Sequence, residues 1–189
     1  WYDHVSIAER QPGSTFKPIN LALALQEGVI QPNETVYDSG ALTIGGWPIR
    51  NHDRKGNGVI DFATVLQVSS NVGMVQAMRK MQPSDYWDWL SRLGLDAKPD
   101  TDLPGAVAGQ LKTKEQFTTQ PIEPATAAFG QGFSLTPLKL VQLHALIANG
   151  GRLVSPHITR GLRAGHALAP SGERMGQPLL RPEVTRTVL

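Results

Sequence analysis

Apolar residues recur at helical spacing in several short segments, and glycine and proline separate these segments along the chain. The first segment runs from Thr15 to Leu25 and stops before Gly28. Pro18 lies within it, and because proline has no amide hydrogen it is tolerated only in the first turn of a helix, where that donor has no partner anyway. The pattern therefore predicts a helix that begins close to Ser14.

Two further helices are predicted on either side of a polar break. Asp61 is a typical helix cap, and apolar residues follow it through Leu66. Residues 69–71 are Ser, Ser and Asn, which favour caps and turns over helix interiors. A new apolar spacing starts at Val72, so we expect the two helices to be separated at 69–71.

The rest of the chain predicts a little β-structure among helices and loops. Short β-branched runs interrupted by glycine at 37–60 indicate a small hairpin or an irregular excursion, and residues 96–120 are expected to form loops and short extended pieces. Three more helices are expected from their end signals: 83–93, closed by Gly94; one opened by Thr136 and Pro137 and ended at 149–151; and one opened by Pro182.

Composition then excludes several classes of protein. The 189 residues have the length of one domain, and with 40% hydrophobic and 18% charged residues they are typical of a folded chain. The net charge of +2 is too small for a concentrated basic face, so nucleic acid is not an expected partner. The absence of Cys rules out disulfides, thiolate nucleophiles and Cys-ligated metals.

Both ends of the chain have the pattern of a fragment. No stretch approaches the roughly 18 consecutive apolar residues of a membrane helix, and the sequence at 1–4 has neither a signal-peptide pattern nor an initiator Met. Pro182 opens a helix pattern only a few residues before Leu189. We therefore expect residues 1–189 to be cut from a longer protein.

Ser14 and Lys17 are the first candidates for chemistry. Three residues apart on a helix, they share one face, and a serine hydroxyl becomes a nucleophile when a neighbouring base takes its proton. Chance alone gives roughly 0.4 such pairs in a chain of this composition, so a capping serine beside a solvated lysine is the competing interpretation.

The start of the helix favours the catalytic interpretation. A helix that begins at Ser14 points its free amide hydrogens and positive dipole end at the serine, where acyl transfer develops an oxyanion. The dipole disfavours a protonated Lys17 by only about 0.3–1 kcal/mol, less than the roughly 1.36 kcal/mol that shifts a pKa by one unit. Desolvation has to supply the rest, so the hypothesis requires a largely buried Lys17 amine.

Three segments, in this order, resemble signatures of the penicillin-binding protein transpeptidase family. They are Pro12-Gly13-Ser14-Thr15-Phe16-Lys17-Pro18, then Ser69-Ser70-Asn71-Val72-Gly73, then Phe129-Gly130-Gln131-Gly132-Phe133-Ser134-Leu135-Thr136-Pro137. The third favours class B of the family, and the second, with Leu103-Pro104-Gly105, is more similar to the cell-division (septal) branch than to the elongation branch. The resemblance implies an α+β fold of the penicillin-binding/serine β-lactamase type, here its helix-rich part with an incomplete antiparallel sheet.

The resemblance also implies a role for each matching residue. Ser14 would attack the carbonyl between the two terminal D-alanines of a peptidoglycan stem peptide, and Lys17 would take its proton. Ser69 would pass a proton toward the leaving group. Asn71 would hydrogen-bond the acyl-chain amide and orient Lys17, so Ser14 and Asn71 also bind substrate. An amine of a second stem peptide would then convert the acyl-enzyme into a cross-link, and β-lactam antibiotics would acylate the same serine.

For the whole protein, the resemblance implies septal cell-wall synthesis at the bacterial inner membrane. The anchor would lie outside this chain and the catalytic domain in the periplasm or at the cell exterior. Implied partners are peptidoglycan stem peptides, β-lactams, a glycosyltransferase and other cell-division membrane proteins. No cofactor is expected.

One element of the family is missing. A Lys-Thr/Ser-Gly strand supplies the second oxyanion amide in the family and binds the terminal carboxylate, and Lys112-Thr113-Lys114 is a false match because it lacks the glycine and precedes the third signature. The resemblance thus implies that residues 1–189 are a partial transpeptidase domain, without the start of the sheet and the Lys-Thr-Gly strand, and that the isolated chain is weakly acylated or inactive. Smaller departures from the family pattern are Arg10, Gln11, Ala106 and Lys139.

The other polar and aromatic candidates are assigned to structure. Trp87 and Trp89 are expected to pack in the core or an interface, and the mixed-charge loop of Arg50, Asp53, Arg54 and Lys55 to be solvated without a function. No metal is assigned, because none of the histidines has metal-ligand spacing: His4, His52, His144, His157 and His166.

Two alternatives to a transpeptidase stay open. A serine β-lactamase or carboxypeptidase of the same superfamily would use water in place of the amine, although the Gly-Gln-Gly to Thr-Pro signature argues against it. A β-lactam sensor or a structural partner in a wall-synthesis complex would have no catalytic cycle at all.

Overall fold

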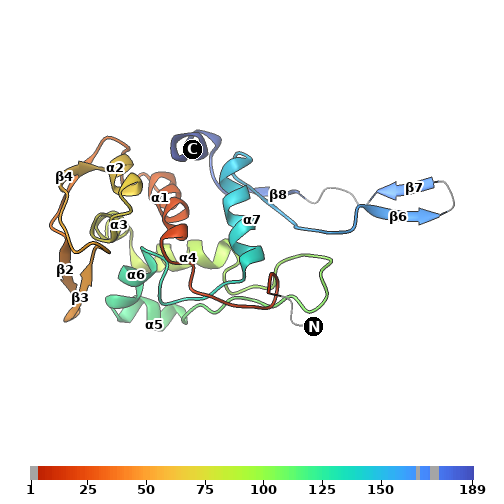
Figure 1. The fold of residues 1–189 in the computed structure, drawn as a ribbon, viewed down its shortest axis with the longest axis horizontal. Coiled ribbons are helices and arrows are strands. Elements are labelled where there is room, and N and C mark those ends of the chain that lie inside the picture. The colour runs from red at the N-terminus through yellow and green to blue at the C-terminus, as the bar shows by residue number, and fades with distance from the viewer. Residues whose placement is uncertain (1–3, 165–166, 171–174) are drawn as a thin grey trace.

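The computed structural model describes residues 4–164, 167–170 and 175–189. Helices form the body of the molecule, and an extended arm of strands projects from one side (Figure 1). The helices, in chain order, are η1 (Gly13–Phe16), α1 (Lys17–Gln26), α2 (Phe62–Gln67), α3 (Asn71–Met78), α4 (Pro83–Arg92), α5 (Lys114–Thr119), α6 (Ile122–Ala127), α7 (Pro137–Ala148) and α8 (Pro182–Val188), of which η1 is a 3₁₀ turn.

The strands form short antiparallel pairs, so the fold is α+β with an incomplete antiparallel sheet, as predicted. β2 (Ala41–Ile44) and β3 (Trp47–Arg50) make the hairpin expected within 37–60, and Gly45 and Gly46 both have positive φ in its two-residue turn. The other pairs are β1 (Thr35–Asp38) with β4 (Gly58–Asp61), β5 (Arg152–Val154) with β8 (Met175–Pro178), and β6 (Gly161–Ala164) with β7 (Ala167–Pro170).

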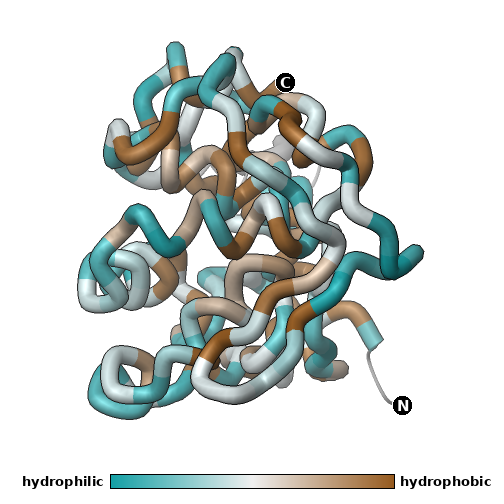
Figure 2. Tube along the Cα trace, turned by 90° about the vertical axis from the view of Figure 1, so that its left-hand side faces the viewer, coloured by the Kyte–Doolittle hydropathy of each residue, from teal (hydrophilic) through white to brown (hydrophobic). Residues whose placement is uncertain are grey.

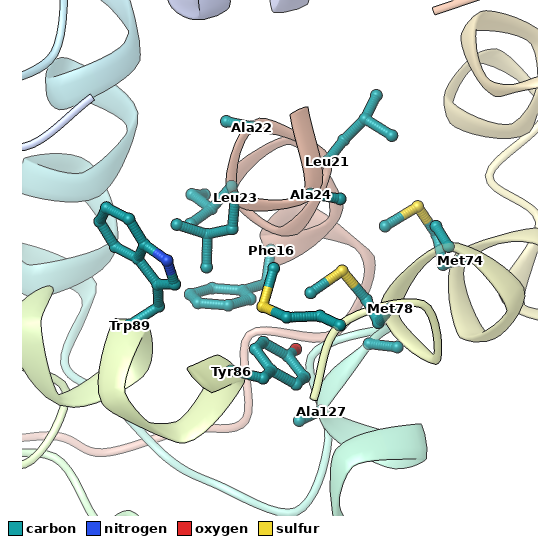
Figure 3. Close-up of a cluster of buried hydrophobic side chains, with 14 of the residues drawn as sticks. Phe16, Leu21, Ala22, Leu23, Ala24, Met74, Met78, Tyr86, Trp89 and Ala127 are labelled. Carbon is teal, nitrogen blue, oxygen red and sulfur yellow. The ribbon is translucent and has the colours of Figure 1, made fainter. Parts of the chain in front are cut away.

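Helix α1 runs through the centre of the core. It follows directly on η1, and Pro18 is its second residue, so the predicted helix start near Ser14 is confirmed. Residues 19–24 are buried on every side of the helix, which is typical of a helix enclosed by other elements. Figure 3 shows side chains of α1 (Leu21, Ala22, Leu23 and Ala24) together with those that surround them: Phe16 of η1, Met74 and Met78 of α3, Tyr86 and Trp89 of α4, and Ala127 of α6.

One buried amide ties α1 to its neighbours. Asn20 donates from Nδ2 to the carbonyl oxygens of Ala127 and Ala128, at 2.8 and 2.9 Å, and accepts at Oδ1 from the Tyr86 hydroxyl at 2.8 Å. Buried polar groups stabilise a fold only when they are hydrogen-bonded, and these are. The turn after α6, which includes Phe129 and Gly130, is thereby fixed against the helix that begins beside Ser14.

The predicted separation of two helices at 69–71 is confirmed, because α2 ends before this segment and α3 begins at its last residue. Asp61 caps α2 by accepting from the Thr64 amide, at 2.7 Å. Ser70 caps α3 by accepting from the Gly73 amide, at 2.8 Å. Between the helices the chain turns at Ser69, whose φ of +56° is uncommon for a residue with a side chain.

The expectation of loops throughout 96–120 is wrong in part. Thr113 accepts from the Gln116 amide and Gln116 reaches back to the Thr113 amide, which is a capping box that starts α5. Only Phe117 of this short helix is buried, so its apolar periodicity is too weak to reveal it. The predicted helices that became α4, α7 and α8 are confirmed, α7 with Thr136 as its cap.

Hydrophobic and hydrophilic residues alternate along the trace, without one long apolar block (Figure 2). Within the described part of the chain, no helix is long and apolar enough to cross a membrane.

Candidate active site

Ser14 lies at the mouth of the central helix, exposed in the 3₁₀ turn that precedes α1. A second turn braces this one, since the Gly13 amide donates to the Gly130 carbonyl at 2.8 Å. Gly130 has a φ of +77°, and a Cβ on it would collide with the carbonyl oxygen of Gly13. The third sequence signature therefore has a physical purpose here, because its first glycine lets the two turns touch.

The amine of Lys17 is buried, as the hypothesis requires. The residue is 1% exposed, and its Nζ donates to the Ser69 carbonyl at 2.6 Å, to Asn71 Oδ1 at 2.7 Å and to Ser69 Oγ at 3.0 Å. Burial lowers the pKa of Lys17 from 10.5 to about 8. The solvated-lysine interpretation is wrong, because this amine is enclosed and fully hydrogen-bonded.

Ser69 and Asn71 approach the amine from the break between α2 and α3. The left-handed turn at Ser69 brings both its carbonyl oxygen and its hydroxyl to the same nitrogen. Asn71, the first residue of α3, accepts from Lys17 at Oδ1 and donates from Nδ2 to the Arg50 carbonyl at 2.9 Å. Two residues 52 and 54 positions away from Lys17 thus supply all three acceptors of its amine.

Ser14 lines the same cavity as Ser69 and Asn71, but it makes no hydrogen bond to the Lys17 side chain in the described structure. Within the described residues no hydrogen bond links the two side chains, because the three N–H donors of a charged Lys17 are taken by Ser69 and Asn71. Ser14, Ser69 and Asn71 line one cavity of about 640 Å³, and Lys17 lies beneath its lining. The remaining lining residues are Gly13, Arg50, Asn51, His52, Asp53, Asn57, Val68, Phe129 and Gln131.

A smaller groove of about 310 Å³ adjoins this cavity, and the two share Arg50, Asn71, Phe129 and Gln131. The β2–β3 hairpin forms one side of the groove, where Trp47 is 64% exposed. The space beside Ser14 therefore extends along β3 toward Trp47.

The mixed-charge loop of Arg50, Asp53, Arg54 and Lys55 is solvated as predicted, but part of it lies at this site. Arg50 and Asp53 are solvent-exposed as expected, but both also line the cavity beside Ser14. His52, which was considered only as a metal ligand, lines it too, as do Asn51 and Asn57, which were not singled out. Their spacing carries no local signal, because the fold alone brings the β3–β4 connection to the Ser69 turn.

Other candidates lie away from the cavity and are structural. Trp89 is buried and donates to Glu27 at 2.7 Å, and Trp87 donates to the Lys112 carbonyl at 2.8 Å, so the packing predicted for both is confirmed. Thr113 caps α5, which agrees with the rejection of residues 112–114 as the missing strand element.

No group of three or more metal-ligating side chains occurs in residues 4–164, 167–170 and 175–189. His144 contacts the Thr15 carbonyl at 2.9 Å, next to the Ser14 turn, and His166 lies outside the described residues.

The fold and the clustered signatures place the chain in a known class of mixed α+β domains. It belongs to the penicillin-binding protein transpeptidase domain family, which matches residues 1–185. It is 44% identical over 163 residues to a peptidoglycan D,D-transpeptidase FtsI homolog of Chlorokybus atmophyticus, an alignment that covers 80% of this chain and 24% of the relative. It is 31% identical over 180 residues to the penicillin-binding protein PbpB of Mycobacterium tuberculosis, covering 94% of this chain and 25% of that one.

Solved structures agree with this assignment. The transpeptidase domain of Burkholderia pseudomallei penicillin-binding protein 3 superposes with a TM-score of 0.84 at 30% identity, over 98% of this chain and 53% of that one. The expected resemblance to the penicillin-binding protein transpeptidase family is thus confirmed, and the similar proteins include ones named FtsI homolog and penicillin-binding protein 3. The chain spans about a quarter of the length of the curated relatives named above.

Proposed function

We propose that the protein containing these residues is a peptidoglycan D,D-transpeptidase that works through an acyl-enzyme on Ser14. The observation that carries the proposal is the buried amine of Lys17, held by Ser69 and Asn71 below the cavity that Ser14 lines. Family membership and the names of the relatives support the same activity.

Lys17 is suited to be the general base. A pKa of about 8 leaves a usable fraction of the amine neutral near physiological pH, and the ideal base titrates close to the working pH. When the amine loses a proton it keeps two N–H donors and gains a lone pair, so one of its three contacts must reverse or break. The hydrogen bond to Ser69 Oγ, at 3.0 Å, is the longest of the three and can reverse, because a hydroxyl can donate as well as accept.

The reaction follows from these positions. Ser14 Oγ attacks the carbonyl between the two terminal D-alanines, and its proton passes to Lys17. The carbon–nitrogen bond of the tetrahedral intermediate then breaks, and the departing D-alanine amine takes a proton that returns from Lys17 through Ser69. The amine of a second stem peptide attacks the ester, the carbon–oxygen bond breaks and the proton returns to Ser14.

Asn71 and the start of η1 have free donors for the substrate: Asn71 for an amide of the acyl chain, and the Ser14 amide for the oxyanion. One N–H of Asn71 Nδ2 donates to the Arg50 carbonyl, which leaves the other to donate to a substrate amide. The Ser14 amide, near the start of the helix, has no intrahelical carbonyl to donate to and is suited to stabilise an oxyanion. The groove along Trp47 and Arg50 gives the acceptor peptide a path to the ester.

Residues 1–189 are on this proposal part of a larger transpeptidase domain, which the coverage of only 53% of the Burkholderia domain supports. A Lys-Thr/Ser-Gly strand elsewhere in the parent protein would complete the oxyanion hole and bind the terminal carboxylate. The isolated chain is accordingly expected to react weakly, or not at all, with β-lactams.

The cellular setting is part of the same proposal. The parent protein is anchored in the bacterial inner membrane outside these residues, faces the cell wall and acts in septal synthesis beside a glycosyltransferase and other division proteins. Similarity to relatives named FtsI homolog supports the septal role. A structural neighbour from Burkholderia ambifaria described as a peptidoglycan glycosyltransferase is consistent with that partnership.

Labelling of the parent protein with a fluorescent penicillin tests the activity. We expect one label per molecule, complete loss of the label in Ser14→Ala, and full labelling of Thr15→Ala, the neighbouring hydroxyl that donates to the Pro12 carbonyl instead. A cross-linked product from two stem peptides then distinguishes a transpeptidase from a carboxypeptidase or β-lactamase, which transfer the acyl group to water. Labelling that survives Ser14→Ala would contradict the proposal.

A further inference from the structure

A carboxylate that no sequence signature contains lies behind the lysine cluster. Asp38, the last residue of β1, is 0% exposed. Its oxygens accept from five donor contacts between 2.6 and 2.9 Å, all from uncharged groups: the Gly40 amide, Asn51 Nδ2 to both oxygens, Asn57 Nδ2 and the Ser70 hydroxyl.

Asp38 is held as an ion without a cation beside it. No ion pair in the described part of the chain includes it. Burial by itself raises the pKa of a carboxyl group, but the hydrogen bonds that Asp38 accepts outweigh burial and leave its pKa below the usual value. Because an ionised carboxylate only accepts hydrogen bonds, it fixes the direction in which each neighbouring amide and hydroxyl points.

Asn51 transmits that direction to the start of α3. Its Nδ2 donates to both oxygens of Asp38 at 2.9 Å and to the Lys55 carbonyl at 2.9 Å. Its Oδ1 therefore has to face the other way, where it accepts from the amides of Asn71 and Val72 at 2.9 and 3.1 Å. Rotating this side chain by half a turn would set its donors against the amides of Asn71 and Val72, and its acceptor against the oxygens of Asp38.

A continuous chain of hydrogen bonds links Asp38 to the amine of Lys17. Asp38 orients Asn51, Asn51 holds the backbone of Asn71, and Asn71 Oδ1 accepts from Lys17 Nζ at 2.7 Å. A second, shorter route runs from Asp38 to Ser70, whose hydroxyl also caps α3. Both routes converge on residues 69–71, which supply every acceptor of the lysine.

We propose that Asp38 and Asn51 are positioning residues for the acylation of Ser14, which hold Ser69 and Asn71 in place around the amine of Lys17. This inference rests on the proposed function and adds residues that touch neither the reacting serine nor its base. Asn51 lines the cavity as well, but its side-chain atoms are engaged with Asp38 and α3, so it serves the site through Asn71.

The test is the acylation kinetics of the parent protein with a fluorescent penicillin. Two quantities are measured: the rate constant at saturating penicillin, expressed per labelled molecule, and the penicillin concentration that gives half of that rate. We expect Asn51→Leu, which keeps the size but none of the hydrogen bonds, to lower the rate constant by about tenfold to 100-fold, the cost of small misplacements in an active site. The half-saturating concentration should change by less than about threefold.

Asp61→Ala is the matched control. Asp61 is a capping carboxylate at the start of α2, and it contacts neither Asn51 nor the lysine cluster. The loss of the cap should lower the melting temperature but leave the rate constant per labelled molecule within about twofold.

Asp38→Asn should behave like Asn51→Leu, since its new NH₂ group opposes the donors of Asn51 and Asn57. Asp38→Glu restores the carboxylate and should recover part of the rate.

The outcomes separate this inference from the proposed function. If penicillin fails to label the wild-type parent protein at Ser14, both are overturned. If the wild type is labelled and Asn51→Leu and Asp38→Asn react at the wild-type rate, only the positioning role is overturned. Should Asn51→Leu fail to fold, Asn51→Asp decides: it keeps an acceptor for α3 but not the donor toward Asp38, so we expect a slowed rate, and a wild-type rate would contradict the inference.

Discussion

Two lysines of this molecule are buried to nearly the same degree, and only one of them lies at a serine. Lys17 is 1% exposed and Lys139 is 5% exposed, and burial lowers the pKa of each from 10.5 to about 8. Lys17 donates to three acceptors beside the Ser14 cavity. Lys139 lies in the first turn of α7, and its Nζ reaches Gly94, just after α4, where the charge of Asp96 partly offsets the effect of burial. Burial alone therefore does not identify a catalytic amine.

The difference between the two amines lies in what surrounds them. Around Lys17, one serine supplies two acceptors and an asparagine supplies the third, and each of these groups is fixed by the break between α2 and α3. Around Lys139, a nearby carboxylate favours the charged form, which is the opposite of what a base needs. A perturbed pKa marks a functional amine only where a cavity and a nucleophile accompany it.

The largest expected effect comes from removing each amine in turn. Lys17→Met should slow penicillin acylation of the parent protein by about 100-fold to 10,000-fold, the usual contribution of a general base. Lys139→Met is the matched control, with the same side-chain change at a similarly buried site, and should leave the rate per labelled molecule unchanged. Stopped-flow labelling measures both variants, and equal losses in the two would remove the distinction between the lysines.

Displacing Ser14 without touching either lysine should give the next largest effect. Gly130→Ala places a methyl group against the Gly13 carbonyl, so the turn that carries Ser14 has to move. We expect acylation to slow by about 100-fold.

Gly28→Ala is the control for backbone strain, because Gly28 also has positive φ but faces open space. It should cost about 1–2 kcal/mol of stability and no activity. If Gly130→Ala were acylated as fast as Gly28→Ala, the bracing of the Ser14 turn would have no functional role.

The pH dependence of folding stability should reflect both lysines, whereas acylation should depend on Lys17 alone. Each folded-state pKa is about 8 and each ordinary value is 10.5, so the unfolded chain binds protons more tightly than the folded one between these limits. Stability should therefore rise as the pH increases from about 8 to about 10.5, by on the order of 3 kcal/mol for each lysine, because below pH 8 the folded protein bears the full cost of burying two charged amines.

Denaturant unfolding of the wild type and of Lys139→Met at several pH values checks this expectation. The variant should lose about half of the increase, since only Lys17 still contributes. An unchanged increase in Lys139→Met would mean that the amine of Lys139 is not desolvated in the folded protein.

The smallest effect is expected at Asp96. Its side chain is exposed, and exposed charge pairs contribute about 0–1 kcal/mol, so Asp96→Asn should lower stability at neutral pH by less than about 1 kcal/mol. The acylation rate should not change. Urea unfolding curves and labelling kinetics of this variant test whether the surroundings of Lys139 serve only stability.

What the sequence could predict were local features. Asp61 and Thr136 start helices through bonds to residues three positions away, and Pro18 requires an early helix start, so these needed no knowledge of the fold. The capping box of α5 is equally local but was missed, because Phe117 is the only residue of that helix in the core.

The supporting part of the site could not be predicted for a different reason. Asn51 reaches Asn71 across 20 residues, and Asp38 reaches Ser70 across 32, through pairings that only the folded chain creates. The left-handed turn at Ser69 is also invisible in the sequence, since serine rarely adopts it. Motifs predicted Ser14, Lys17, Ser69 and Asn71, but not the residues that hold them in place.

The pH dependence of Ser14 acylation in the parent protein tests the central claim most directly. If the amine of Lys17 is the base, the rate constant for penicillin labelling should rise about tenfold per pH unit below the Lys17 pKa and level off near pH 8. The profile of Lys139→Met should coincide with that of the wild type. A rate that stays constant from pH 6 to pH 9 in the wild type would contradict the account.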